Sequence, residues 1–266
     1  GAAAFLRRGR PPVPLPAMLG LPWRSAAAPP PPPTTVYDFL RDASELRDQM
    51  IGVLLSLLLL GVLDILFCRR FRARWMALHT IANIVVVATT IFDVMNAADN
   101  PILSCVGKGQ SDVPTNMIVA LHLYHLLLFD CGFDDVLHHV IFVGLIGGLG
   151  VFFDVNFPVK NLIAFFMCGL PGGLDYLMLT LVKQELMSPL TEKAWNSRIN
   201  VWIRSPGLLL CAFCVYQAAR HGPADSACAL HPGIAGAVAL LCVGNGQYYM
   251  QRVTGNTYRK VQRFSS

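Results

Sequence analysis

The chain has 266 residues, of which 54% are hydrophobic and only 14% are charged, and its mean hydropathy is +0.50. Soluble domains usually carry about 25% charged residues, so this composition excludes an ordinary soluble globular protein. The net charge of +5 is modest and no nucleic-acid-binding motif is present, so membrane lipids are the expected partners, not nucleic acid. Continuous apolar runs without strict alternation predict an all-α, polytopic membrane protein.

Composition divides the chain into three parts. Residues 1–49 form a Pro-, Ala- and Arg-rich arm with an amphipathic lead-in, residues 50–251 form the transmembrane domain, and residues 252–266 form a basic tail. Five consecutive prolines, Pro29 to Pro33, predict an extended polyproline segment in the arm. The arm suits an organelle targeting segment and a disordered tail equally, and both interpretations stay open.

About seven transmembrane helices are expected, because each needs roughly 20 mostly apolar residues. They are predicted at residues 50–67, 75–94, 115–129, 136–153, 161–182, 206–219 and 232–250. With this count the basic segments 69–74, 183–204 and 252–263 fall on one side of the membrane, as the positive-inside rule requires. The fifth span is interrupted by Gly169-Leu-Pro171-Gly-Gly173, which predicts a kink.

Carboxylates and imidazoles stand at the start of the fourth predicted span. Asp134 precedes His138 by four residues, and Asp135 precedes His139 by four, so each pair shares one helix face and can hydrogen-bond. Ionisable residues inside membranes usually mark functional sites. We therefore predict His138 or His139 as a general base, with the two aspartates orienting the rings.

Other polar residues occur within the neighbouring spans. The residues expected to line a cavity are His79, His122, Tyr124, His125 and Asp175. Three interpretations of the histidines stay open: a catalytic base, a buried polar network that orders the bundle, and a zinc site. No metal ligand and no cofactor is assigned, because the histidine spacing matches no complete metal motif. Asp64 and Asn83 are expected to make contacts inside the bundle, and Asp93 is expected to reach the membrane interface.

The positions of the cysteines do not predict a redox or zinc site. Cys211 and Cys214 have the spacing of a redox or zinc pair, but they lie in an apolar span without further ligands, which favours core packing. Cys105 and Cys228 fall in predicted loops, so a disulfide between them requires that both loops share an oxidising compartment.

Several landmarks occur in a fixed order along the chain. They are Trp75 and His79 after a basic turn, Asp99-Asn-Pro101, Ala120-Leu-His-Leu-Tyr124, Asp134 with His138-His139, and Asn245, Tyr248-Tyr249, Gly255 and Arg259-Lys260. Together they resemble the TLC-domain family, over residues 75–260. The resemblance implies a ring of six core helices around a lipid-accessible cavity, with an extra helix outside.

For the ceramide-synthase relatives, the resemblance implies acyl transfer from acyl-CoA to a long-chain base, with His138 and His139 as the catalytic pair. Here the residues after His139 are apolar, where that pattern has a polar run ending in paired aspartates. The chain is therefore more similar to TLC relatives that are linked to membrane lipid composition.

The expected function is lipid or acyl-chain binding by an integral protein of the endoplasmic reticulum or of an organelle membrane, with an influence on membrane lipid composition. If the protein is an enzyme, acyl-CoA is the expected substrate. The alternative, suggested by the Arg- and Pro-rich arm, is an accessory subunit that binds protein partners in a mitochondrial or plastid membrane complex. A transporter is a further option, suggested by the interrupted fifth span.

Overall fold

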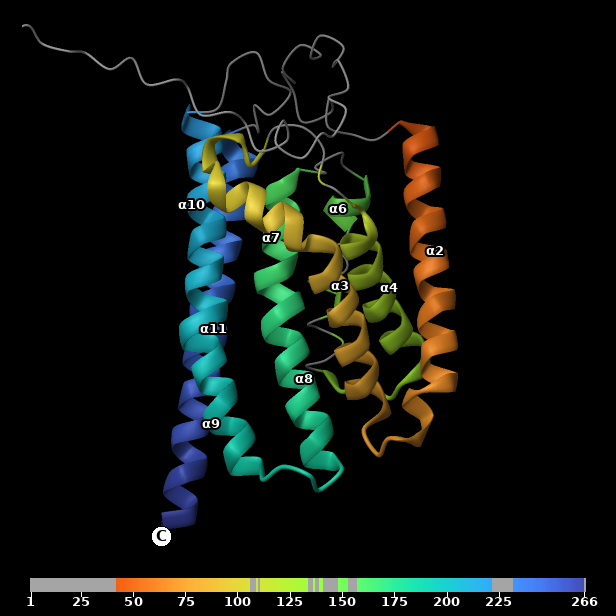
Figure 1. Ribbon diagram of the computed structural model, residues 1–266, viewed down its shortest axis with the longest axis vertical. Helices are drawn as coiled ribbons and strands as arrows, with labels where there is room; N and C mark the ends of the chain where they lie inside the picture. The colour runs from red at the N-terminus through yellow and green to blue at the C-terminus, as the bar shows by residue number, and fades with distance from the viewer. Residues whose placement is uncertain are drawn as a thin grey trace, which may run out of the picture. The chain divides into compact units, whose positions relative to one another are not determined.

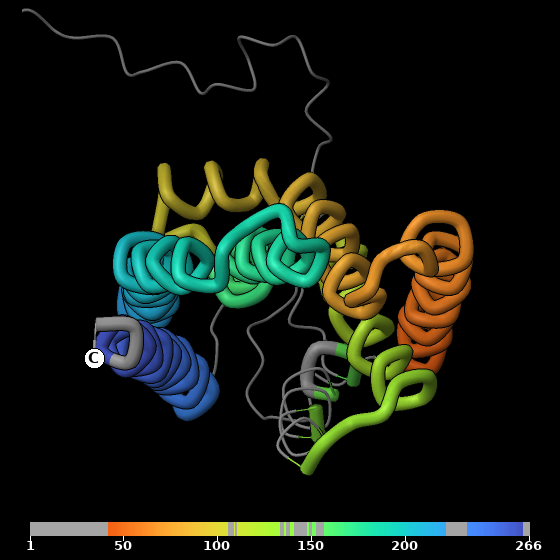
Figure 2. Tube along the Cα trace, turned by 90° about the horizontal axis from the view of Figure 1, so that it is seen from below, coloured from red at the N-terminus to blue at the C-terminus, as the bar shows by residue number. Residues whose placement is uncertain are grey.

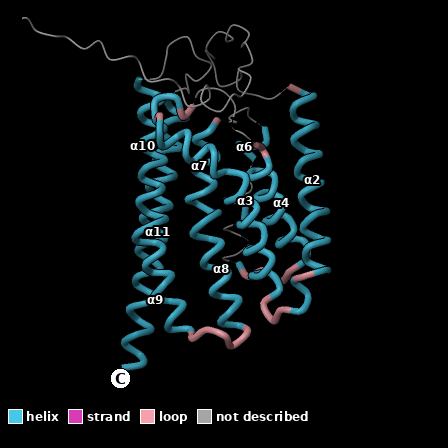
Figure 3. The backbone as a smooth tube through the Cα atoms, viewed as in Figure 1, coloured by secondary structure: helices cyan, strands magenta, loops and turns pink. Residues whose placement is uncertain are grey.

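The computed structural model describes residues 42–105, 109, 111–133, 136, 139–140, 148–152, 157–221 and 232–265. All of these residues belong to one compact unit that spans residues 31–266. Every element in this described part of the chain is helical, and none is a strand (Figure 1, Figure 3). The prediction of an all-α protein is confirmed for these residues.

Four helical stretches are long and apolar enough to cross a membrane: Ala43–Leu66, Arg74–Asp99, Pro158–Lys183 and Pro189–His221. They correspond to α2, to α3, to the run α7–η5–α8, and to the run α9–η6–α10. The helix α4 (Val113–Leu128) is apolar but shorter, and α11 (Pro232–Ser265) is not among the four. Most of the predicted fourth span lies outside the described residues, so a total of seven spans stays a prediction.

The helix α2 (Ala43–Leu66) has the polarity expected of a helix that faces lipid. Its start is capped by Asp42, which accepts hydrogen bonds of 2.8 Å from the backbone N–H groups of Ser44 and Glu45. Leu54, Leu55 and Leu58 are 56–68% exposed, whereas the buried side includes the polar residues Gln49, Ser56 and Asp64. A helix on the surface of a soluble protein shows the opposite arrangement, so this pattern supports a lipid environment.

Two of the membrane-length stretches contain a π-helical turn. The turn η5 (Phe165–Gly169) lies between α7 (Pro158–Ala164) and α8 (Leu170–Lys183), and η6 (Asn200–Arg204) lies between α9 (Pro189–Ile199) and α10 (Ser205–His221). Each turn ends two residues before a proline, Pro171 or Pro206. Proline cannot donate to the helix ladder and its ring crowds the carbonyl four residues earlier, so a wider turn relieves both problems.

The helix α3 (Arg74–Asp99) is the central element. It packs against α4, α7 and α8, while α2 packs against α4, and α11 packs against α9 and α10. Figure 2 shows α2 and α4 on one flank of α3, with α10 and α11 on the far side of α8. One apolar core joins α2, α3 and α4, and a second contains Cys211 and Cys214, both fully buried. The core-packing interpretation of these two cysteines agrees with that position.

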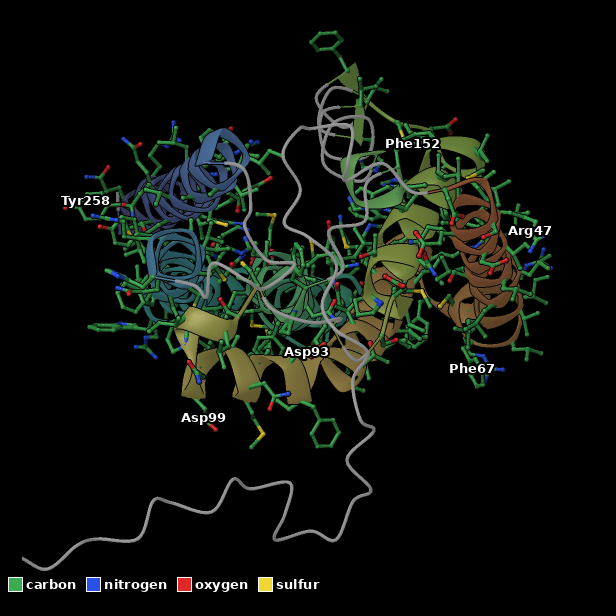
Figure 4. All side chains as sticks on the ribbon, turned by 90° about the horizontal axis from the view of Figure 1, so that it is seen from above. Arg47, Phe67, Asp93, Asp99, Phe152 and Tyr258 are labelled. Carbon is green, nitrogen blue, oxygen red and sulfur yellow. The ribbon has the colours of Figure 1, made fainter. Side chains whose placement is uncertain are left out.

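Interior polar residues pair across helices. Asn161 Nδ2 donates to Asp93 Oδ2 at 2.6 Å, and Asp93 is only 1% exposed. Asp93 is therefore enclosed by protein at the contact between α3 and α7, and its depth relative to the membrane interface stays a prediction. Figure 4 shows Asp93 among the side chains inside the bundle, whereas Arg47 and Tyr258 lie on opposite outer flanks.

The proposed boundaries at residues 49/50 and 251/252 do not coincide with helix ends. The helix α2 already begins at Ala43, and α11 continues without interruption through the basic residues to Ser265. The amphipathic lead-in and most of the basic tail are thus continuous with the helices of the membrane domain.

Candidate functional site

A cavity of about 200 Å³ lies between α3, α4, α8 and α11, and both π-helical turns contribute to its wall. We call it the central cavity. Its apolar wall includes Ile118, Leu121, Met167 and Val253. Its polar lining residues are His79, Asn83, His122, Asp175, Tyr176, Arg204, Asn245, Tyr249, Arg252 and Asn256. Such a mixture of apolar surface with a limited set of polar groups is typical of a ligand pocket.

Four histidines from three parts of the chain meet beside this cavity: His79 on α3, His122 and His125 on α4, and His139. The ring centroids of His79 and His125 are 5.4 Å apart, those of His125 and His139 are 4.7 Å apart, and those of His122 and His139 are 5.0 Å apart. His139 Nε2 and His125 Nδ1 lie 2.9 Å apart and share a hydrogen bond. We call these four residues the histidine cluster.

The hydrogen bonds fix which ring nitrogen is basic in the two histidines that line the cavity. His79 Nδ1 lies 2.8 Å from the carbonyl oxygen of Trp75, and His122 Nδ1 lies 2.7 Å from that of Ile118. A carbonyl oxygen only accepts, so Nδ1 carries the hydrogen in both rings. In the neutral form of each ring, Nε2 is therefore the nitrogen that can take up a proton.

Trp75 supports the histidine cluster from the start of α3. Its ring stacks on His125 at 5.1 Å with an interplanar angle of 19°, and meets His79 edge-on at 5.4 Å. Tyr176 on α8 packs against His79 at 4.5 Å. Rings held on both sides in this way have little freedom to rotate, so the positions of the imidazoles are well defined.

A ladder of polar side chains from α8 and from the run α9–η6 reaches the cavity at Asp175 and Arg204. Asn196 Nδ2 donates to Asp175 Oδ1 at 2.6 Å, Asn200 Nδ2 donates to Asn196 Oδ1 at 2.7 Å, and Arg204 Nη1 donates to Asn200 Oδ1 at 3.1 Å. The last three residues are spaced by four and so lie on one helix face. Arg204 also lies over the ring of Tyr249 at 5.1 Å.

The structure places the predicted site residues in three groups. His79, His122 and Asp175 line the central cavity, and His125 and His139 belong to the histidine cluster. His138, Asp134 and Asp135 lie outside the described residues, as does Cys228.

Tyr124 departs from the expectation. It is not among the residues that line the cavity; its hydroxyl donates to Asp64 Oδ2 at 2.7 Å, on α2. Tyr124 lies two positions after His122, which is about 200° around a helix, so the two side chains leave α4 on opposite sides. His125, three residues from His122, returns to the same side.

Sequence reasoning missed Arg204 and Tyr249 as cavity residues. The sequence places Arg204 in a basic segment on one side of the membrane, because the next apolar run begins at Pro206. The available signal was the spacing of Asn196, Asn200 and Arg204, which predicts one polar face on a helix that becomes apolar.

Within the described part of the chain, no group of three or more His, Cys, Asp or Glu side chains is placed to hold a metal ion. The hydrogen bond between His139 and His125 also uses a ring lone pair that a metal would need. The described side chains of the site offer imidazoles that can transfer protons and guanidinium groups that can pair with anions.

No protein-family model matches the sequence, and the searches of curated proteins and of solved structures found no match.

Proposed function

We propose that this integral membrane protein binds a lipid or acyl chain in the central cavity and thereby influences membrane lipid composition. The observation that carries the proposal is a cavity whose lining combines apolar side chains with polar and charged groups, inside a helix bundle that exposes many large apolar side chains. An amphiphile combines an apolar chain with a polar head, which suits such a mixed lining.

The surroundings of the cavity favour a lipid over a water-soluble ligand. The helices α3 and α8, which border the cavity, belong to stretches that are long and apolar enough to cross a membrane. A hydrophobic chain that enters from the bilayer keeps an apolar environment throughout, whereas a soluble ligand has to leave water. The resemblance to the TLC-domain family supports the same proposal.

A variant that fills the cavity tests this proposal. Ile118 lines the central cavity, so Ile118→Trp places an indole where the chain of the ligand would lie. Purified full-length protein in nanodiscs is photolabelled with a diazirine analogue of hexadecanol, and the labelled peptides are identified by mass spectrometry. We expect labels on cavity residues of α3, α4 and α11, and at least several-fold weaker labelling in Ile118→Trp.

The matched control is Ile84→Trp. Ile84 lies on α3 but is 61% exposed on the outer face, and it does not line the cavity. This variant should retain the labelling of cavity peptides. Labels confined to outward-facing residues, with no effect of Ile118→Trp, would show that the probe contacts only the bilayer-facing surface and would contradict lipid binding in the cavity.

A second candidate function is acyl transfer from acyl-CoA to an amine or hydroxyl acceptor. The observation that favours it is the position of His79 and His122, which line the cavity with Nδ1 bonded to a backbone carbonyl, so that Nε2 is the basic nitrogen of each neutral ring. In that reaction the base removes the proton of the nucleophile as it attacks the thioester carbonyl, and the thiol of CoA leaves. We include His138 and His139 in this proposal, with Asp134 and Asp135 as orienting groups.

Membranes that contain the protein are assayed with palmitoyl-CoA and a long-chain base, and the amide product is measured by mass spectrometry. We expect His122→Ala and His139→Ala to lower turnover by about 100-fold or more, the range of general-base catalysis. His221→Ala is the control, since His221 is exposed at the end of α10. Equal turnover in all variants would remove the catalytic proposal and leave lipid binding unaffected.

A further inference from the structure

We infer that the ligand of the central cavity carries an acidic head group, a carboxylate or a phosphate, which binds the guanidinium of Arg204. This inference rests on the proposed binding of a lipid or acyl chain, and it specifies the class of that ligand. It depends on the environment of Arg204 and on the charges around the cavity.

Arg204 is buried but its hydrogen-bonding capacity is mostly unused. The residue is 8% exposed, its Nη1 donates to Asn200 Oδ1, and its Nε has no hydrogen-bond partner. A buried donor without a partner is costly, and such donors are rare in native proteins. The side chain lines the central cavity, so an occupant of the cavity is the natural partner for this group.

The geometry of the unused donors matches an oxyanion. Arg204 Nη1 is held by Asn200, so the edge formed by Nε and Nη2 is directed away from that bond. Two parallel N–H groups on one guanidinium edge bind both oxygens of a carboxylate or phosphate. The ring of Tyr249, 5.1 Å from the guanidinium carbon, covers one of its faces and holds its plane in position.

The charges around the cavity favour an anion. Two guanidinium groups, Arg204 and Arg252, line it, and Asp175 is the single carboxylate among the described lining residues. Asp175 accepts a hydrogen bond from Asn196, and no carboxylate in the described part of the chain forms an ion pair with Arg204. A second polar atom without a partner, Asn245 Oδ1, lies in the same lining and can accept a hydrogen bond from a protonated acid or a hydroxyl of the head group.

Competition binding tests the inference. The full-length protein in nanodiscs is photolabelled with the diazirine analogue of hexadecanol, and unlabelled palmitate, hexadecyl phosphate, hexadecanol or inorganic phosphate is added as competitor. We expect palmitate or hexadecyl phosphate to compete at least about tenfold better than hexadecanol, because hydrogen bonds to a charged group are strong. We expect this preference to disappear in Arg204→Gln and to be reduced in Arg204→Lys, which keeps the charge but loses the planar fork.

Arg198→Gln is the matched control, since Arg198 precedes Arg204 on the same helical run, is exposed, and does not line the cavity. Equal competition by palmitate, hexadecyl phosphate and hexadecanol, unchanged in Arg204→Gln, would overturn the acidic head group and leave lipid binding intact. Competition by inorganic phosphate equal to that of hexadecyl phosphate would assign the site to a free oxyanion and overturn the lipid assignment. Absence of cavity labelling would overturn both proposals.

Discussion

Arg74 and Asp64 form a two-bond ion pair at the junction between α2 and α3, with the Asp64 side chain completely buried. Arg74 Nε donates to Asp64 Oδ1 at 2.6 Å, its second bond uses Nη2 and Oδ2, and the Tyr124 hydroxyl donates to the same Oδ2. Three helices are thereby connected through one carboxylate. Together with the central cavity, this contact shows that polar side chains organise the interior while leucines cover the exterior.

Removal of Arg74 should be strongly destabilising. In Arg74→Met the carboxylate of Asp64 stays buried without its cation, and breaking a buried pair in this way costs about 3 kcal/mol or more of the free energy of unfolding. Thermal unfolding in a mild detergent measures the effect. Arg72→Met is the control: Arg72 pairs with Glu185 at the surface, with side-chain exposures of 66% and 76%, so its loss should cost less than about 1 kcal/mol. Similar losses in both variants would contradict the buried role of Asp64.

Two glycine-to-alanine variants should have opposite effects. A Cβ on Gly207 would lie 2.1 Å from Phe166 Cδ1, so Gly207→Ala must push α10 away from η5, at a cost of about 1–3 kcal/mol. A Cβ on Gly244 in α11 meets nothing within 4 Å. Gly244→Ala should therefore stabilise the helix by about 0.5–1 kcal/mol, because alanine loses less backbone entropy on folding. Melting temperatures of the two purified variants decide the matter, and the same direction of shift in both would refute the close contact.

Glu185 has a backbone conformation that favours glycine. It follows the end of α8 with φ 63°, while Leu186 N–H bonds to the carbonyl of Leu181 and Glu185 N–H bonds to that of Val182. This is a Schellman helix end, in which the left-handed residue is usually glycine. Glu185→Gly should stabilise the protein by about 1 kcal/mol even though the exposed pair with Arg72 is lost.

The control for this prediction is Gln184→Gly. Gln184 has φ −86°, so glycine there adds only flexibility to the unfolded chain and should be destabilising. Unfolding curves that rank the two variants in the reverse order would show that the conformation of Glu185 is not strained.

Cys68, between α2 and α3, should be chemically inert at neutral pH. Its thiol is fully buried, and burial, followed by the negative charge of Asp64, raises its pKa to about 11. At pH 8 only about one thiol in a thousand is then the reactive thiolate. Alkylation with iodoacetamide, followed by mass spectrometry, should label Cys68 slowly in the folded protein and quickly after unfolding in SDS.

The raised pKa of Cys68 also predicts a dependence of stability on pH. Above about pH 9 the thiol ionises in the unfolded chain but keeps its proton in the folded one, so the stability from this group is present at lower pH and is lost as the pH rises towards 11. Cys68→Ala should show a smaller decline over this range. Identical pH profiles for the two proteins would contradict a buried, protonated thiol.

The sequence predicted the helical class and the positions of three of the four membrane-length stretches, because runs of leucine, valine and isoleucine identify them directly; the fourth, Pro189–His221, begins well before the predicted span at residues 206–219. It also indicated which histidines fall on neighbouring spans. It could not predict that Tyr124 contacts α2 or that Asp93 contacts α7. Spacing within one helix determines which residues share a face, but not which neighbouring helix that face contacts. Arg204 was missed because tertiary packing, which the local sequence does not specify, determines whether a charged residue near a proline faces water, lipid headgroups or the protein interior.

The two π-helical turns change the direction in which the side chains beyond them point. A wider turn rotates everything beyond it by roughly a quarter turn relative to an uninterrupted α-helix of equal length. Pro206 follows the turn η6 and has no polar side-chain group of its own. It therefore helps to determine the direction in which the guanidinium of Arg204 points. Replacing Pro206 with alanine would let the π-helical turn tighten into an α-helical one, so the selectivity of the proposed ligand site would become tunable from a position that does not line the central cavity.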